Sequence, residues 1–226
     1  MGILRSLLMV FEDKREILDL ESFEDELAFR ISWDPLVGGG TNFCTHRLQK
    51  TSGLMNNSIE FKPTFIAYLA SISFAVLGLI AFLVTLSSGS MESGALALIA
   101  LALLGFGLWS LRDLVKQKSS FSSSSRVFYK NTKSCGFDNI CAIQLLREYV
   151  GQNKHSYYSY ELNLVCINGE RINIVDHGAL HAIREDASIL ADYLSIPVWD
   201  AIDFRISDSD SDQALKIEVL RNNLFG

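Results

Sequence analysis

Two nearly uninterrupted apolar runs, residues 65–86 and 94–111, dominate the hydrophobic pattern of this chain. Each is close to the ~20 residues that an α-helix needs to cross ~30 Å of hydrocarbon at a rise of ~1.5 Å per residue. Only the short polar segment 87–93 separates the runs. We therefore expect a two-helix transmembrane hairpin over residues 65–111, with both flanking segments on the same side of a membrane.

The charges around the hairpin predict its orientation. Basic residues flank both runs, and the connecting segment contains no lysine or arginine: Arg47, Lys50 and Lys62 precede the runs, and Arg112, Lys116, Lys118 and Arg126 follow them. Because positive residues accumulate in cytoplasmic loops, both termini are expected in the cytoplasm. The runs contain no charged residue or histidine, which disfavours an ion path through the hairpin.

Small residues mark one face of the first run. Ala67, Ser71 and Ala75 are spaced four apart, so they share a face on which another helix can approach closely. The nearest partner for this face is the second helix of the same hairpin.

The segments outside the hairpin show the alternation and turn signals of β-strands. Glycines 38–40 and Asn56-Asn57 predict turns before the hairpin, and Asn168-Gly169 predicts a type I′ hairpin turn after it. Serine-rich residues 119–125 are interpreted as a flexible spacer. The predicted strands are 27–33, 42–49 and 58–62 before the hairpin, and 126–130, 139–150, 156–167 and 171–175 after it.

One amphipathic helix is expected after the last strand, at residues 179–194, with Pro197 ending it. The chain is therefore expected to be an α+β membrane protein in which the hairpin is inserted into a β-rich barrel or sheet with a C-terminal helix. The alternative is a small separate sheet of the first three strands beside a four-stranded sheet. The expected segments are 1–25 (amphipathic, helical), 26–64 (strands), 65–111 (hairpin), 112–125 (linker), 126–200 (strands and helix) and 201–226 (acidic tail with a short helix).

Residues 126–199 resemble the cytoplasmic part of bacterial membrane proteins with pleckstrin-homology-like (PH-like) domains. The similar stretches are 126–129 (RVFY), 143–146 (IQLL), 160–165 (YELNLV), Asn168-Gly169 and 191–199 (ADYLSIPVW). This resemblance implies a PH-like barrel, a location in the bacterial inner membrane and a role in binding rather than catalysis.

Net charge and cysteine spacing limit the kinds of binding partner and metal site that are expected. The net charge of −6 opposes sequence-independent attraction to nucleic acid, so no nucleic-acid partner is expected. The four cysteines form no CxxC pair, and a cytoplasmic location would keep them reduced.

Several groups invite chemical hypotheses. His177, His181 and Glu185, spaced four apart, are the best arrangement of metal ligands, although the HExxH pattern is missing. Cys44 and His46 would share one face of a strand. The glycine turn at 38–40 lacks the lysine of a phosphate loop, and the alternating aspartates 208–212 lack the glycine and glutamate of an EF-hand. No cofactor is expected.

We therefore expect a non-catalytic membrane adaptor or scaffold whose soluble domain binds a protein partner, a second copy or membrane lipids. An accessory subunit of a larger transport or secretion complex is the alternative, and a membrane-bound metal enzyme using His177 and His181 is the third possibility. The expected binding residues are Trp33, Asp34, Arg47, Lys50, Tyr158, Tyr160, Trp199 and Asp200.

Overall fold

The structure is a computed structural model that describes residues 15–53, 56–88, 93–116, 118–152 and 155–206. Residues 1–14 of the expected amphipathic segment 1–25, the aspartates 208–212 and the short helix of the acidic tail lie outside the described residues.

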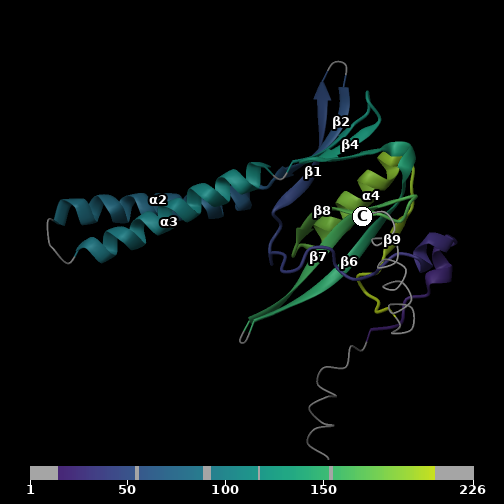
Figure 1. Cartoon of the computed structure of the whole chain (residues 1–226), viewed down its shortest axis with the longest axis horizontal. Helices are drawn as coiled ribbons and strands as arrows, with labels where there is room; N and C mark the ends of the chain where they lie inside the picture. Colours follow the sequence, from purple (N-terminus) through teal and green to yellow (C-terminus); the bar gives the residue numbers. More distant parts are fainter. Residues whose placement is uncertain (1–14, 54–55, 89–92, 117, 153–154, 207–226) are drawn as a thin grey trace, which may run out of the picture.

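The two apolar runs form two long antiparallel helices, α2 (Phe65–Ser88) and α3 (Ser93–Lys116), which extend from one side of the soluble domain (Figure 1). Both are long and apolar enough to cross a membrane. At ~1.5 Å per residue, each helix is about 36 Å long. The predicted hairpin is therefore present, and its helices fit a two-pass membrane protein.

Small residues hold the two helices together, as the spacing of Ala67, Ser71 and Ala75 predicts. Ala67 and Ser71 are buried, and the Ser71 hydroxyl lies 2.8 Å from the Ser110 hydroxyl of α3. A side chain at Gly107 of α3 would collide with the backbone of Ala75. The backbones of the two helices therefore approach closely along this face.

The first sheet has five antiparallel strands in the order β1-β2-β3-β4-β5. Their bounds are β1 His46–Gly53, β2 Asn56–Pro63, β3 Ser119–Ser122, β4 Val127–Lys130 and β5 Lys133–Gly136. Ile59 of β2 pairs with Phe121 of β3, so the hairpin is inserted between two neighbouring strands of one sheet. The alternative of a separate sheet before the hairpin is therefore wrong.

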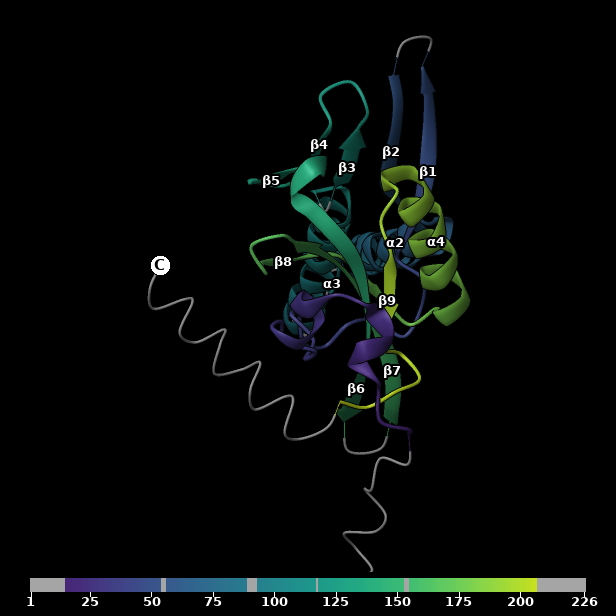
Figure 2. The same cartoon turned by 90° about the vertical axis from the view of Figure 1, so that its right-hand side faces the viewer.

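The second sheet has the order β8-β7-β6-β9, and the short strand β9 runs parallel to β6. A 3₁₀ turn, η3 (Phe137–Asn139), connects the two sheets. The described strands form two sheets rather than one closed barrel. The bounds are β6 Ile140–Gln152, β7 His155–Cys166, β8 Arg171–His177 and β9 Val198–Asp200. Figure 2 shows the β1–β2 and β6–β7 hairpins pointing in opposite directions.

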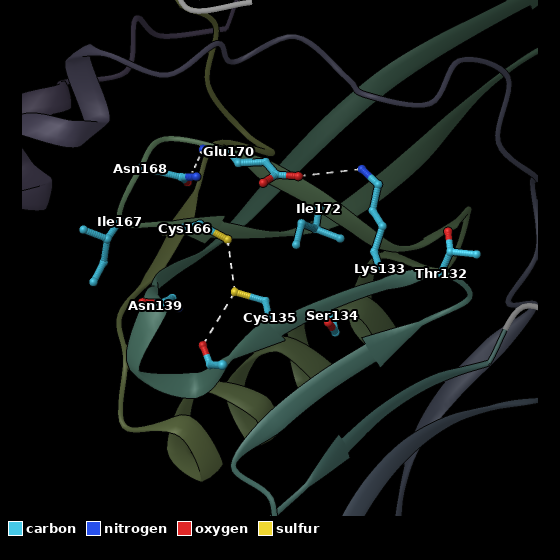
Figure 3. Close-up of a pocket in the computed structure, with 11 residues that line it drawn as sticks. Thr132, Lys133, Ser134, Cys135, Asn139, Cys166, Ile167, Asn168, Glu170 and Ile172 are labelled. Atoms are coloured by element: carbon cyan, nitrogen blue, oxygen red, sulfur yellow. Dashed lines mark hydrogen bonds and ion pairs between the residues drawn. The ribbon is translucent and has the colours of Figure 1, made fainter. Parts of the chain in front are cut away.

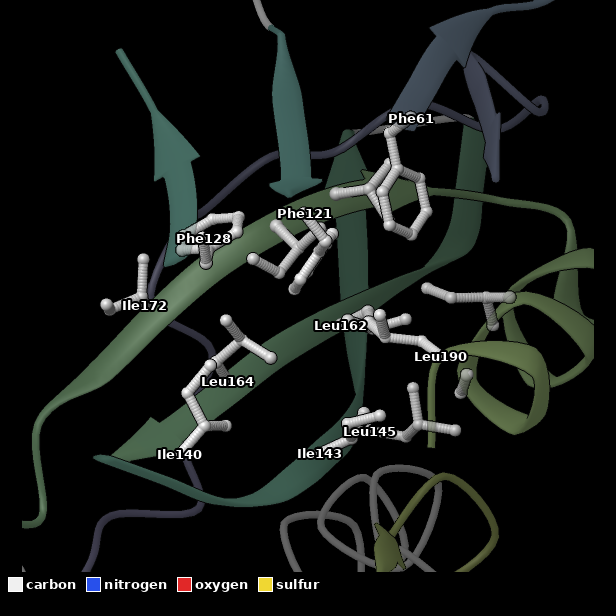
Figure 4. Close-up of a cluster of buried hydrophobic side chains, with 14 of the residues drawn as sticks. Phe61, Phe121, Phe128, Ile140, Ile143, Leu145, Leu162, Leu164, Ile172 and Leu190 are labelled. Carbon is white, nitrogen blue, oxygen red and sulfur yellow. The ribbon is translucent and has the colours of Figure 1, made fainter. Parts of the chain in front are cut away.

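The main core lies between the two sheets and α4 (Leu180–Leu194). Phe121 and Phe128 of the first sheet have ring centroids 4.7 Å apart and lie above Leu162 and Leu164 of β7 (Figure 4). The apolar face of α4 closes this core through Ile183, Ala187 and Leu190. The C-terminal helix is thus confirmed. It ends at Leu194, and Ser195 follows in a left-handed conformation two residues before Pro197.

The opposite face of the second sheet is covered by the segment before the hairpin. This segment contains two 3₁₀ helices, η1 (Leu20–Phe23) and η2 (Glu26–Phe29), so the predicted strand at 27–33 is wrong. The carboxylates of Asp19 and Asp25 accept hydrogen bonds from backbone N–H groups two residues later. Such local bonds favour helical turns over a strand.

Three further expectations need correction. The serine-rich spacer contains strand β3, because pairing with β2 buries Ser119 and Phe121. Asn56 and Asn57 pair with β1 instead of forming a turn.

The β7–β8 turn is not the predicted type I′ turn, which needs positive φ at both central residues. Gly169 has φ +80°, and its N–H donates a hydrogen bond to the Cys166 carbonyl, but the φ of Asn168 is not positive.

Candidate functional site

An exposed cluster of tyrosine and arginine lies on the long β6–β7 hairpin. Tyr149 and Tyr158 are directly opposite each other in the ladder, with ring centroids 5.6 Å apart. Their exposed fractions are 59% and 46%, which is high for aromatic side chains. The Arg147 guanidinium lies 4.5 Å from the Tyr158 ring centroid, in a cation–π contact. We call Arg147, Tyr149 and Tyr158 the hairpin cluster.

Arg147 also lines a cavity of about 350 Å³ in the soluble domain. Arg15 and Arg205 line the same cavity, together with Trp33 and Asp34. The Nε of Arg147 is buried and has no hydrogen-bond partner among the described residues. Three arginines and one aspartate line this cavity, although Arg15 and Arg205 also donate to backbone carbonyls. This balance of charge favours a carboxylate or a phosphate as ligand.

Two predicted binding residues, Trp33 and Trp199, are buried instead of lying on the surface, and only Trp33 lines the cavity. Trp199 is completely buried, and the centroid of its ring system lies 6.2 Å from that of Trp33. Trp33 donates from Nε1 to the Ala28 carbonyl at 2.8 Å. Asp34 is exposed, and its carbonyl accepts from Arg171 at 2.7 Å. The tryptophans therefore position the segment that carries Asp34.

The predicted basic residues of β1 have different environments. Arg47 donates from Nε to Asp186 of α4 at 3.0 Å, and from Nη2 to Glu185 at 2.6 Å. Burial raises the pKa of Asp186 to about 6, against the opposing effect of hydrogen bonds from Leu48 and Arg47. Lys50 is exposed on the same strand. Arg47 thus fastens α4 to the first sheet, whereas Lys50 is accessible.

The remaining predicted binding residues lie apart from the hairpin cluster. Tyr160 is partly buried against the main core. Asp200 accepts from Arg184 at 2.7 Å and from the Ile202 N–H at 2.9 Å, which joins α4 to the chain after β9. Both residues contribute to packing in this structure.

The histidines of the metal hypothesis are not brought together. His177 is the last residue of β8 and is fully buried, whereas His181 is exposed on α4 and Glu185 pairs with Arg47. Among the described residues, no group of three histidine, cysteine or acidic side chains has the geometry of a metal site. The helical spacing fails because α4 begins only at Leu180.

Cys44 contacts His177 and not the His46 ring. Its sulfur lies 3.8 Å from Nε2 of His177 and donates to the His46 carbonyl. Burial raises the pKa of the Cys44 thiol and lowers the pKa of His177 to about 4. Both groups are therefore neutral at pH 7, which disfavours a thiolate nucleophile.

A larger cavity, of about 690 Å³, lies between β5 and the β7–β8 turn (Figure 3). The sulfur atoms of Cys135 and Cys166 face each other here at 3.4 Å. Lys133 and Glu170 form an ion pair at 3.8 Å across the opening. Cys135 belongs to the first sheet and Cys166 to the second, so the thiols meet where the two sheets join.

Comparison with models of protein families, with curated proteins and with solved structures finds no match for this chain. The resemblance to PH-like domains therefore stays a prediction.

Of the residues at this candidate site, Trp33, Asp34 and Tyr158 are among those predicted from the sequence, whereas Arg147 and Tyr149 are not. Arg147 gains its role from a partner eleven positions away on β7 and from residues at both ends of the described chain. The available signal was the Arg-x-Tyr pattern of residues 147–149 facing a tyrosine-rich strand.

Proposed function

We propose that this chain is a non-catalytic membrane adaptor that binds an acidic segment of a protein partner at the hairpin cluster and the adjoining arginine cavity. The observation that carries the proposal is the environment of Arg147. Its guanidinium stacks on an exposed tyrosine, and its buried Nε has no partner among the described residues. Tyrosine and arginine are the residue types enriched at the energetic centres of protein interfaces.

The way the hairpin joins the domain supports an adaptor role. Thr64 alone separates β2 from α2, and residues 117–118 separate α3 from β3. Because β2 and β3 pair with each other, a hairpin inserted in a membrane would hold the domain at a fixed distance from it. A partner bound to the hairpin cluster would therefore be kept close to the bilayer.

We further propose a PH-like domain in the bacterial inner membrane, with both termini in the cytoplasm. Two antiparallel meanders, β1–β5 and β6–β8, followed by α4 support the first part. The basic residues beside the ends of the hairpin, including Lys62 and Lys116, support the orientation.

Extraction of the tagged full-length protein from its native membrane, followed by native mass spectrometry, tests the adaptor role. We expect a second protein at a fixed ratio, lost from the double variant Arg147→Gln/Tyr158→Ala. Removing interface residues of this kind costs about 2 kcal/mol or more, which weakens binding roughly 30-fold.

Tyr129→Ala is the matched control, because Tyr129 is 45% exposed but lies on β4, in the other sheet. This variant should keep the partner. Recovery of the wild-type protein alone, or of the same complex with the double variant, would refute the proposal. A partner retained by all three proteins would instead indicate an accessory subunit held through its transmembrane helices.

A further inference from the structure

A second cavity, of about 460 Å³, lies where the transmembrane hairpin meets the soluble domain. Its walls come from the segment 37–46, the first turns of α2, the last turns of α3 and Asp176 of β8. Its size falls within the range of ~300–1,000 Å³ that is typical of small-molecule sites. None of the residues of the hairpin cluster lines it.

The lining changes from apolar to polar along the axis of the hairpin. Phe74 and Phe106 lie farthest from the soluble domain along their helices and pack edge to face, with centroids 5.4 Å apart. Ser71 and Ser110 follow about one turn nearer the domain, joined by their hydrogen bond. Asp113 comes last, seven residues after Phe106 and thus about 10 Å along the helix.

This gradient lies at the edge of the expected hydrocarbon layer. Helices of about 36 Å exceed a hydrocarbon thickness of ~30 Å, so their domain-proximal turns extend into the headgroup region. The phenylalanines then lie at the level of the acyl chains, and Asp113 and Asp176 at the level of the headgroups. An amphiphile oriented like the surrounding lipids matches this arrangement.

The charge of the polar end selects the headgroup. No lysine or arginine lines the cavity, and the ionisable residues that do are His46, Asp113 and Asp176. His46 is buried, and burial lowers its pKa, so its ring is neutral at pH 7. The lining of the polar end is therefore negative and disfavours an anionic headgroup. The nearby Lys130 ammonium acts on Asp176, but it donates to the Asn173 and Ile174 carbonyls and does not line the cavity.

Asp176 provides the most specific feature. One carboxylate oxygen accepts from Ser159, whereas Oδ2 is buried and has no hydrogen-bond partner among the described residues. Burial raises the pKa of Asp176 to about 6, so the carboxylate is mostly ionised at pH 7. A Cβ at Gly40 would collide with this carboxylate, so only glycine lets the segment pack here. A buried charged acceptor of this kind needs a hydrogen-bond donor.

We propose that this cavity binds one phospholipid with a primary ammonium headgroup, a phosphatidylethanolamine, with the ammonium on Asp176 and Asp113 and the chains against Phe74 and Phe106. A primary ammonium donates three hydrogen bonds, whereas the quaternary ammonium of a choline lipid donates none. The proposal rests on the placement of the hairpin in a membrane and is independent of the protein partner.

The test is native mass spectrometry of the full-length protein released from bilayers that contain equal amounts of ethanolamine, choline and glycerol phospholipids. We expect one ethanolamine lipid per chain, retained about tenfold over the other two, because its ammonium donates charge-assisted hydrogen bonds, which are stronger than neutral ones. Asp176→Asn should abolish the preference. Asp192→Asn, on the exposed part of α4, should leave it unchanged.

A second variant tests the cavity without touching its charge. Ala70→Trp places a large side chain in the cavity, and we expect loss of the retained lipid. Leu77→Trp is the control, since Leu77 is 60% exposed on the same helix and does not line the cavity. Equal retention of ethanolamine and choline lipids, preference for the glycerol lipid, or unchanged retention with both cavity variants would overturn the proposal. A protein that fails to enter the membrane would overturn the hairpin placement instead.

Discussion

Arg47 and Lys50 carry the same charge and lie three residues apart on β1, but the structure gives them different roles. Arg47 neutralises the completely buried Asp186, whereas Lys50 is exposed. The sequence places Arg47 in the predicted strand 42–49 and Lys50 directly after it, both as basic residues before the hairpin, and cannot distinguish their roles. The difference comes from α4, which brings Asp186 to β1 across 139 positions of the chain.

We predict that Arg47→Met destabilises the protein by about 3 kcal/mol, because it leaves a buried carboxylate without its counter-charge. At ~2–4 °C per kcal/mol for a chain of this size, the melting temperature should fall by about 6–12 °C. Lys50→Met should change the stability by less than about 0.5 kcal/mol. Thermal unfolding in one detergent compares the two, and equal melting temperatures would contradict the role of Arg47.

His177 gives a prediction about pH. Its pKa falls from 6.5 to about 4 on folding because the ring is buried, so below pH 6.5 only the unfolded state gains the proton. Its contribution to stability is thus complete above pH 6.5 and is lost as the pH falls towards 4. Relative to His177→Asn, the free energy of unfolding of the wild type should fall by about 2 kcal/mol from pH 7 to pH 5.

The wild type is compared with His177→Asn because Asp176 and Asp186 have raised pKa values, so their contribution to stability increases as the pH falls. Both aspartates are present in the wild type and the variant, so their contributions cancel. Parallel pH profiles would instead show that His177 gains its proton at the same pH in the folded and the unfolded protein.

At the scale of elements, the parts that sequence predicts are those with their own local signal. The hairpin helices, the long strands β6 and β7, and α4 each carry a pattern over ten or more residues. β3, β5 and β9 span only three or four residues each, and β3 consists mostly of serine. Such short strands form because a neighbouring strand pairs with them. The local sequence pattern therefore cannot predict them.

The same distinction applies to the candidate site. Tyrosines on a strand are visible in the sequence, and Tyr158 is among the predicted binding residues, but only the structure shows that its side chain is exposed. The contact of Arg147 with Tyr158, and the cavity shared with Arg15 and Arg205, depend on strand register and on the path of both chain ends. These features could not be predicted without the fold.

Because α2 and α3 approach closely, substitutions at two nearby glycines of α3 should change the stability by different amounts. Gly107→Leu should separate the helices, because any side chain there collides with the backbone of Ala75. Gly105→Leu should be tolerated, since no atom lies within 4 Å of a Cβ at that position. Overpacking costs ~1–3 kcal/mol or more. Melting temperatures in detergent would show the difference, and equal values would contradict this packing of the hairpin.

In the whole molecule, the contact between Cys135 and Cys166 provides a test of how the two sheets pack. With sulfur atoms 3.4 Å apart, they should form a disulfide when the folded protein is treated with a small-molecule disulfide at pH 9. Peptide mapping should find β5 joined to β7, with Cys44 and Cys141 unpaired with each other. Crosslinks between other cysteine pairs would show that the sheets pack differently.

A hairpin inserted between the paired strands β2 and β3 requires the segments before and after it to lie on one face of the bilayer. The most direct test uses single-cysteine variants in a cysteine-free background, labelled in sealed native membranes with an impermeant maleimide. Lys50→Cys on β1 and Lys133→Cys on β5 should be labelled from the same side, and Ser90→Cys between the helices from the other. Labelling of Lys50→Cys and Lys133→Cys from opposite sides would show that the two segments do not form one domain, and labelling of all three variants from one side would show that the hairpin does not cross the membrane.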